Sequence, residues 1–372
     1  MNRGVRRRLL ALGVWPALLD AADHVFWKLQ LFCVALLHLL FSSDKHWLSS
    51  SSSSSYTASS PSSADADSTV LLVEPQAAVV TKRKRVLFVR HAESEWNVVF
   101  NRGLNPRALV RLLRAVGREW LLLPSGDSVF LDSPLSRRGR FQAQSLQDVV
   151  CEAALCSLGS TGDDARQALA GAGKTPPHRH SPHQTEEGAL LRYLGCSLPG
   201  SVVVASNLRR TIDTARIASA SRLEAPGEKI HVLSCLQEIG RNVDTLAINQ
   251  PHAIHPHEVL VQAPRGEKRH DELFNVVESH GNKAVLGSGR DRLLTFAHWV
   301  FKQQKDVVVV YGHSLWFRAF CREFFPRDVH HEAKSAKMGN CGVVTFVLEE
   351  LSRGGGEAAQ YSIQPESFHH LI

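Results

Sequence analysis

The chain has 372 residues, 44% of them hydrophobic, so it can bury a large core, and its length alone would suggest two domains. Its formal net charge of +7 comes from basic residues spread along the chain, which favours a small anionic substrate and argues against a nucleic-acid partner. The seven cysteines are odd in number and include no Cys-x-x-Cys pair, which argues against a disulfide framework and predicts a reducing compartment.

Residues 1–48 combine positive charge with apolar stretches. Four arginines lie among the first eight residues, and residues 25–41 are apolar except at three positions. A membrane-spanning helix needs about 20 mostly apolar residues, so this segment is a marginal span; an uncleaved anchor, a helix on the membrane surface and a cleaved targeting peptide are open alternatives. We predict a targeting or anchor segment, with membrane association through residues 25–41, that governs location and is dispensable for catalysis. The catalytic domain is then either cytoplasmic or membrane-anchored.

A serine-rich tract over residues 49–81 follows this segment. Such a polar tract cannot bury enough apolar surface to order itself, which predicts a disordered linker. Residues 82–372 then form one catalytic domain. Within it, the composition near residues 157–190 and 250–289, rich in Gly, Pro, His or charge, predicts two insertions.

Four short apolar runs are each followed by a charged or imidazole side chain. Such runs predict buried strands, and a parallel sheet brings the carboxyl ends of its strands to one edge, where ligands bind. Packing alone does not explain four such coincidences, so we expect a site at this edge. The runs and side chains are residues 86–89 with Arg90 and His91, residues 202–205 with Arg210, residues 230–233 with Glu238, and residues 307–311 with His313.

Local signals complete the expected architecture. Ser206 is a candidate N-cap for the helix that carries Arg210, and Gly312 frees the backbone to turn before His313. Residues 343–348 predict a further strand. We therefore predict a three-layer α/β sandwich with a mainly parallel central sheet.

These residue types suit phosphoryl transfer. A phosphate monoester carries almost two negative charges, which Arg90 and Arg210 can neutralise with bidentate donors, and His313 adds a positive centre if it is protonated. Neutral His91 can then attack phosphorus to give a phosphohistidine. Glu238 can protonate the leaving alkoxide and later take a proton from water.

Residues 90–97 resemble the first motif of the histidine phosphatase superfamily, also called phosphoglycerate mutase-like. That family begins with Arg-His-Gly, followed by an acidic residue, Ser or Thr, and an Asn. The chain matches this motif at Arg90, His91, Glu93, Ser94 and Asn97.

Further segments are similar to the same family in the expected order, from residue 85 to about 348. Residues 206–215 are similar to its second signature, and residues 132–143 to the entry into its first helix. The resemblance implies the phosphoglycerate mutase-like fold and a second phosphate-binding arginine at Arg210. It also implies that Asn97 donates a hydrogen bond to the phosphoryl oxygens.

The chain departs from the family pattern at Ala92, which replaces a glycine and must hold a negative φ. Four side chains have competing interpretations. We expect Arg209, beside Arg210, to be solvated. Glu93 is a rival to Glu238 as the acid. Arg241 and Asp244 either contact the leaving group or form a surface ion pair.

We predict a phosphatase that hydrolyses a phosphomonoester through a phosphohistidine, with no metal and no cofactor. One alternative is a phosphoglycerate mutase, although residues 238–241 lack that enzyme's Glu-Arg-His-Tyr-Gly pattern. The other is a non-catalytic phosphate-binding scaffold, which we would expect to have lost part of the charged set. Histidines at residues 178–183 and 252–257 lack partner cysteines, so we attribute them to chance composition. The substrate is a sugar phosphate, nucleotide, phosphoprotein or lipid phosphate.

Overall fold

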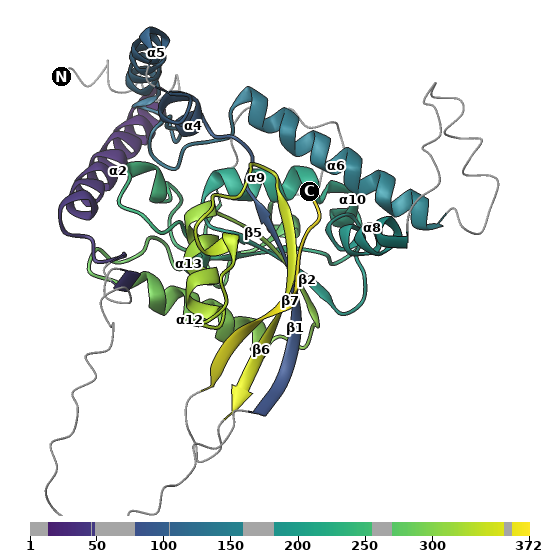
Figure 1. Ribbon diagram of the computed structural model, residues 1–372. Helices are drawn as coiled ribbons and strands as arrows, with labels where there is room; N and C mark the ends of the chain where they lie inside the picture. Colours follow the sequence, from purple (N-terminus) through teal and green to yellow (C-terminus); the bar gives the residue numbers. More distant parts are fainter. Residues whose placement is uncertain are drawn as a thin grey trace, which may run out of the picture.

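The computed structural model describes residues 14–45, 47–48, 79–103, 105–158, 182–254, 270–352 and 359–372. Most of the serine-rich tract and the middle of both predicted insertions lie outside these residues. A seven-stranded sheet with the order β4-β3-β2-β5-β1-β6-β7 runs through the centre (Figure 1). Its strands are β1 (Val79–Arg90), β2 (Ser201–Ser206), β3 (Ile230–Leu233), β4 (Phe274–Asn275), β5 (Val307–Gly312), β6 (Val343–Ser352) and β7 (Gln360–His370).

The sheet is mainly parallel, as the sequence predicts. β5 pairs in parallel with β1 and β2, and β3 pairs in parallel with β2 and β4. β6 runs antiparallel to β1, and β7 runs antiparallel to β6. Every residue of β2 and β5 is buried because helices cover both faces of the sheet.

β1 begins at Val79, inside the tract assigned to the linker, rather than at residue 86. The reason is a pair of cross-strand charge contacts with β6. Arg83 Nε lies 2.8 Å from Glu349 Oε1, and Lys82 Nζ lies 3.5 Å from Glu350 Oε2. Opposite charges on neighbouring strands stabilise the pairing, so polar residues extend a strand that hydrophobicity alone would end.

Helices cover both faces, which confirms the three-layer arrangement (Figure 1). On one face α12 (Gly289–Lys302) and α13 (Ser314–Phe324) pack around Trp316 and Phe320. On the other face lie α6 (Arg137–Leu158), α8 (Pro182–Gly195) and α9 (Arg209–Ala218). The remaining elements are α4 (Glu95–Phe100), α5 (Pro106–Leu122), α10 (Ala220–Leu223), α11 (His270–Leu273), η2 (Ser234–Leu236), η3 (Val243–Thr245) and η5 (Glu332–Lys334).

The N-terminal helix α2 (Val14–Phe41) packs against the side of the α/β domain. Trp27 Nε1 donates a hydrogen bond to the carbonyl oxygen of Ile248 at 2.8 Å. Leu31 is buried in a small cluster with Leu131 and Ile248. Residues 14–45 therefore pack on the α/β domain, whereas the sequence predicts a separate segment.

Candidate active site

His91 follows the last residue of β1, at the carboxyl edge of the sheet, and is buried. Its Nδ1 lies 2.7 Å from the carbonyl oxygen of Ala92. Because a carbonyl only accepts, Nδ1 carries the proton, and Nε2 keeps its lone pair. Ala92 is not among the residues with positive φ, which agrees with the expectation for an alanine at this position.

The backbone around His91 is fixed on three sides. Its amide donates to the carbonyl oxygen of Gly312 at 3.0 Å, and its own carbonyl accepts from Asn340 Nδ2 at 2.9 Å. The amide of Ala92 donates to Thr214 Oγ1 at 3.1 Å. The imidazole is thus held by a rigid strand end, which limits the entropy lost when it aligns with a substrate.

The guanidinium groups of Arg90 and Arg210 each donate through Nη1 to one backbone carbonyl oxygen. Arg90 donates through Nη1 to the carbonyl oxygen of Met338, while its buried Nε has no partner among the described residues. Arg210, in the first turn of α9, donates through Nη1 to the carbonyl oxygen of Asp244 at 2.7 Å, and its Nη2 lies 3.6 Å from Asp244 Oδ2. Both guanidinium groups therefore keep donor capacity for an anion.

His313 stands at the N-cap position of α13 and faces His91, with 5.1 Å between the ring centroids. Its Nε2 lies 2.9 Å from Ser206 Oγ. Its Nδ1 is buried and has no hydrogen-bond partner within the described part of the chain. An unsatisfied ring nitrogen in this position is suited to a polar ligand.

Burial and positive neighbours set the charge of both imidazoles. Burial, then Arg210 and Arg90, hold the pKa of His91 well below its usual range. Burial, then Arg210, His91 and Arg90, do the same to the pKa of His313. Both rings are therefore neutral in the free protein, and the positive centre considered for His313 would need a bound anion to favour it.

Glu238 lies buried beyond η2, where its Oε1 accepts from the amide of Trp316 at 2.8 Å and from the amide of Ile239 at 3.0 Å. The carboxylate is thus also a ligand of the α13 N-terminus. Burial raises the pKa of Glu238, although Arg210 opposes the shift. A raised pKa is what a general acid needs.

Glu93, the rival acid, is already bound elsewhere. Its Oε2 accepts from Arg102 Nη2 at 2.6 Å and from Ser136 Oγ at 2.8 Å. Since Arg102 and Ser136 already hold the Glu93 carboxylate, the arrangement favours Glu238 as the proton donor.

A buried ionic cluster supports the loop that carries Glu238. Lys283 Nζ donates to the carbonyl oxygens of Glu238 at 2.7 Å and Gly240 at 2.6 Å. Asp44 bonds Lys283 at 2.9 Å and Arg292 at 2.6 Å, and its Oδ2 also accepts from the amide of Gly240 at 3.0 Å. Asp44 comes from the segment just after α2, so the N-terminal region helps to position the candidate acid.

Asn97 is used differently from the expectation. Its Oδ1 accepts from the backbone amide of Ser94 at 3.1 Å, and Ser94 Oγ accepts from the amide of Asn97 at 3.3 Å. This capping box begins α4. The Nδ2 group stays without a partner among the described residues, so its donation to a phosphoryl oxygen remains a prediction.

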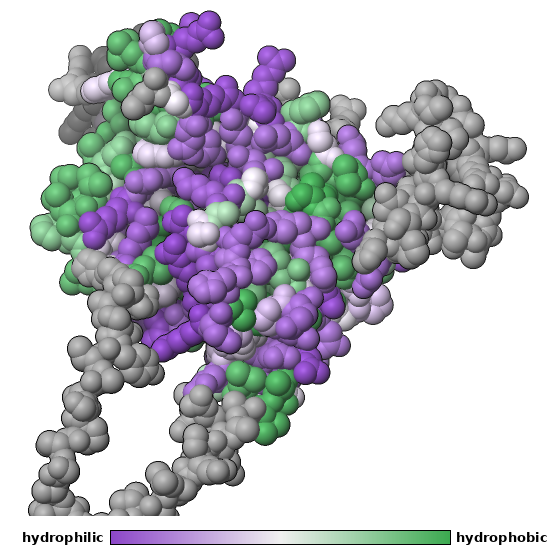
Figure 2. Space-filling model, in the orientation of Figure 1, coloured by the Kyte–Doolittle hydropathy of each residue, from purple (hydrophilic) through white to green (hydrophobic). Residues whose placement is uncertain are grey.

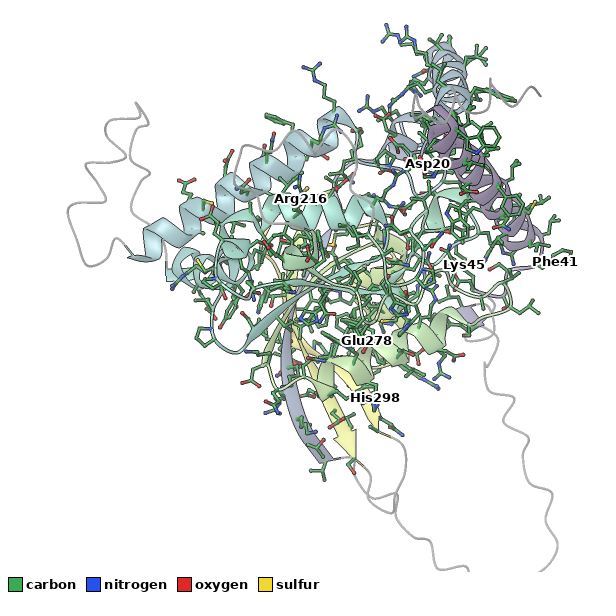
Figure 3. All side chains as sticks on the ribbon, turned by 180° about the vertical axis from the view of Figure 1, so that it is seen from behind. Asp20, Phe41, Lys45, Arg216, Glu278 and His298 are labelled. Atoms are coloured by element: carbon green, nitrogen blue, oxygen red, sulfur yellow. The ribbon has the colours of Figure 1, made fainter. Side chains whose placement is uncertain are left out.

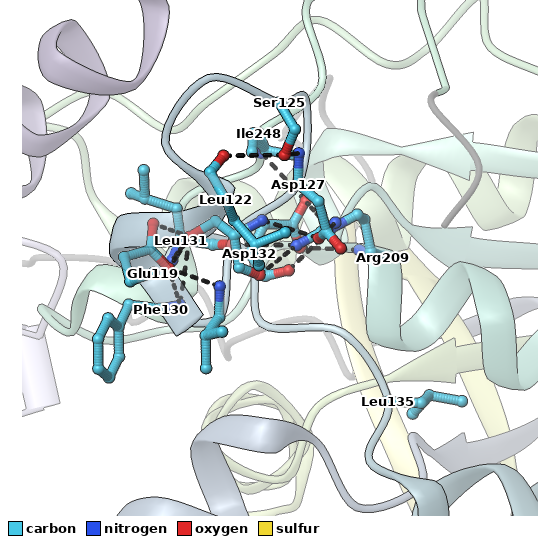
Figure 4. Close-up of polar contacts among 12 residues, drawn as sticks. Glu119, Leu122, Ser125, Asp127, Phe130, Leu131, Asp132, Leu135, Arg209 and Ile248 are labelled. Carbon is cyan, nitrogen blue, oxygen red and sulfur yellow. Dashed lines mark hydrogen bonds and ion pairs between the residues drawn. The ribbon is translucent and has the colours of Figure 1, made fainter. Parts of the chain in front are cut away.

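Two expectations about neighbouring arginine and carboxylate side chains are wrong. Arg209 is buried, not solvated: its Nη1 lies 2.5 Å from Asp127 Oδ1, and its Nε donates to the carbonyl oxygen of Asp132 at 2.9 Å (Figure 4). Asp244 is buried against Arg210 rather than on the surface, and burial raises its pKa to about 6. Polar side chains that pair inside a protein have the same local sequence pattern as surface ones.

Two expectations about the backbone are also corrected. Ser206 ends β2 and binds His313, while the N-cap of α9 is Leu208. Gly312 is required by a close approach rather than by a turn, because a Cβ there would lie 2.7 Å from the Phe88 ring.

Sequence patterns missed the partners that hold the site. Four of these partners are single residues far apart in the chain that no motif marks: Asp44, Lys283, Arg292 and Asn340. The fifth, Thr214, lies within residues 206–215, which resemble the second family signature. Among the described residues, no group of three or more His, Cys, Asp or Glu side chains could hold a metal ion. Of the metal-candidate histidines, residues 178, 180, 255 and 257 lie outside the described residues.

A scan against protein-family models finds no match, and a search of the curated proteins finds none. Among solved structures, a mycobacterial glucosyl-3-phosphoglycerate phosphatase with VO3 is 16% identical; the match covers 76% of this chain and 97% of that one, with a TM-score of 0.34. A mycobacterial hydrolase is 14% identical; the match covers 76% of this chain and 97% of that one, with a TM-score of 0.34. A phosphoserine phosphatase from Entamoeba histolytica is 14% identical; the match covers 70% of this chain and 89% of that one, with a TM-score of 0.30. These neighbours are histidine phosphatase and phosphoglycerate mutase-like proteins, the group that the sequence motifs resemble.

Proposed function

We propose that the protein is a phosphomonoester hydrolase that acts through a phosphohistidine at His91. One observation carries the proposal. The Nδ1 proton of His91 is bound to the Ala92 carbonyl oxygen, which leaves the Nε2 lone pair of a neutral imidazole within the electrostatic influence of Arg210 and Arg90. The His91 imidazole is fixed, neutral and desolvated, and it lies beside the guanidinium groups of Arg90 and Arg210. This is the arrangement of an activated nucleophile for a phosphate.

The first step transfers the phosphoryl group to the protein. His91 Nε2 attacks phosphorus while the bond from phosphorus to the ester oxygen breaks, and Glu238 gives its proton to the departing alkoxide. Arg90 and Arg210 bind the equatorial oxygens. The Ala92 carbonyl stabilises the positive charge that develops on the imidazole.

The second step returns the protein to its starting state. A water attacks the phosphohistidine, its proton passes to the Glu238 carboxylate, and the phosphorus–nitrogen bond breaks to release inorganic phosphate. Glu238 is protonated again and ready for the next substrate. This scheme uses no metal, so activity should survive a chelator.

The test is direct labelling. A panel of ³²P-labelled phosphomonoesters is offered to the full chain, and the quenched protein is assayed for label that acid releases and base does not, which identifies a phosphohistidine. His91→Ala should abolish both label and turnover. His298→Ala, an exposed histidine on α12, serves as the matched control and should change neither. Label that persists in His91→Ala would overturn the assignment.

A further inference from the structure

The exposed face of α5 is apolar, although the helix packs on a soluble domain. Leu109, Leu113, Val116 and Trp120 recur at the spacing of one helical face, and Leu113 and Trp120 are 62% and 72% exposed. The inward face packs Ala115 against Val99 and Val129 and also buries Glu119, whose Oε2 accepts from the amide of Val129 at 2.6 Å. α5 therefore carries more apolar surface than its contacts with the rest of the protein cover.

The outward face of α2 is apolar as well. Phe26, Leu29 and Leu40 are exposed on it, whereas the inward face buries Lys28 and His38 together with Leu31 and Ala35. Figure 2 shows hydrophobic side chains gathered along the edge of the molecule where α2 lies, and in Figure 3 the side chains on the outer side of α2, between the labelled Asp20 and Phe41, project away from the sheet. A patch of this kind on a soluble protein indicates an interaction site.

A direct contact joins the two helices. Lys28 Nζ donates to the carbonyl oxygen of Leu122, the last residue of α5, at 2.5 Å, and also to the carbonyl oxygen of Asp127. The inward face of α2 is thus committed to the catalytic domain through a buried ammonium group. By length and composition α2 could cross a bilayer, but crossing would remove Lys28 and Trp27 from these partners.

The positive charge of α5 indicates what binds the outward faces of the two helices. Along α5, on the side of the helix away from the apolar stripe, four arginines share a second helical face, and four more stand in the first eight residues of the sequence. A helix with an apolar face and an arginine-rich face lies in the plane of a membrane, where anionic headgroups bind the arginines. The α5 arginines are Arg107, Arg111, Arg114 and Arg118.

We propose that the outward faces of α2 and α5 form one docking surface that lies flat on an anionic lipid bilayer without spanning it. Acyl chains would take up the apolar side chains, and headgroup phosphates or carboxylates would pair with the arginines. The site at the sheet edge plays no part in this binding, so the proposal stands independently of the proposed reaction.

The experiment is sedimentation of the full chain with two kinds of vesicle, phosphatidylcholine alone and phosphatidylcholine mixed with phosphatidylserine. We expect binding to the mixed vesicles that weakens as salt rises. Leu113→Glu and Trp120→Glu should each weaken binding to the mixed vesicles about tenfold, because a carboxylate replaces an apolar group that the bilayer would bury. Val79→Glu is the control, since Val79 is 64% exposed at the far end of β1.

A second pair of variants separates charge from hydrophobicity. Arg107→Gln with Arg114→Gln should reduce binding to mixed vesicles, whereas the same charge loss at Arg137 and Arg138 on α6 should leave it nearly unchanged. Failure of the full chain to bind either vesicle overturns the proposal, as does equal binding by Leu113→Glu. Resistance of membrane-bound protein to extraction at pH about 11 would indicate a span. A dimer in light scattering that Leu113→Glu dissociates, without vesicle binding, would assign the surface to a second copy.

Discussion

Asp44 and Lys283 form a buried ion pair, with 2.9 Å between Oδ2 and Nζ, although 239 residues separate them in the sequence. The same Lys283 ammonium group donates to the carbonyl oxygen of Glu238. A residue that follows the N-terminal helix thus reaches the candidate acid through one intermediate side chain. Asp44 is a positioning residue in this arrangement, because it acts on Glu238 only through the loop.

Asp44→Asn should therefore lower turnover of alkyl phosphates more than that of an activated aryl phosphate, since only the alkyl leaving group needs a well-placed acid. Loss of one partner from a buried pair should also cost about 3 kcal/mol of stability. The measurements are kcat on both substrates and urea denaturation. Asp20→Asn, an exposed carboxylate on α2, is the control and should change neither.

The pH dependence of stability gives an independent check on Asp44. Burial alone would raise its pKa, but Lys283 and Arg292 outweigh burial and lower it. A carboxylate with a depressed folded-state pKa stabilises the protein above its unfolded-state pKa, and this contribution is lost as pH falls through the folded value. Wild type should therefore lose more stability on acidification than Asp44→Asn; parallel curves would contradict the pairing.

Removal of residues 1–78 should impair the catalytic domain, contrary to the dispensable segment predicted from sequence. The truncation would expose Leu131 and Ile248 and leave Lys283 and Arg292 without Asp44. We expect a lower unfolding midpoint and lower activity than in a chain that lacks only the serine run at residues 51–55. Equal midpoints and equal activity would mean that α2 contributes only to location.

Glu238→Gln should slow hydrolysis of alkyl phosphates by about 10²–10⁴-fold and affect p-nitrophenyl phosphate far less. Glu93→Gln is the matched control, because Arg102 and Ser136 hold the Glu93 carboxylate. The effect of this substitution on turnover should be the same for every leaving group. Steady-state kinetics on a leaving-group series decide the matter. If Glu238→Gln slows all substrates equally, the proton comes from another donor.

The pH profile of kcat/KM should be bell-shaped. On the acid side activity falls as His91 protonates, and its lowered pKa moves that limb to more acidic pH. On the alkaline side activity falls as Glu238 loses its proton, and its raised pKa moves that limb to higher pH. In Glu238→Gln the alkaline limb should disappear while the acid limb stays; an unchanged alkaline limb would assign it to another group.

Arg209 and Arg210 should separate stability from activity. Arg209→Ala breaks a buried ion pair with Asp127 and should cost roughly 3–5 kcal/mol in urea denaturation. Arg210→Lys keeps the charge but loses the bidentate donor of the guanidinium group. Turnover should therefore fall about 10²-fold, with a smaller loss of stability than in Arg209→Ala. The reverse outcome would exchange the roles of the two arginines.

The sequence by itself determined the mainly parallel sheet and which candidate side chains lie at its carboxyl edge. Valine-rich runs such as residues 307–311 are strands because apolar, β-branched residues pack well on a sheet that is buried on both faces. Arg90, His91 and His313 follow such runs directly, so the strands carry them to one edge. These inferences succeed because periodicity and motif spacing are local properties of the chain.

Only the tertiary structure decided which polar groups pair and which helix faces are covered. Arg209 and Asp44 have the local pattern of surface residues, yet both are buried, because partners distant in sequence offset the cost of removing their charge from water. α5 shows the converse: its apolar stripe predicts a buried face, but the packing of Ala115 and the bonds of Glu119 to the Ser128–Val129 segment hold another face inward. Such choices depend on contacts between residues far apart in the chain, which no local pattern records.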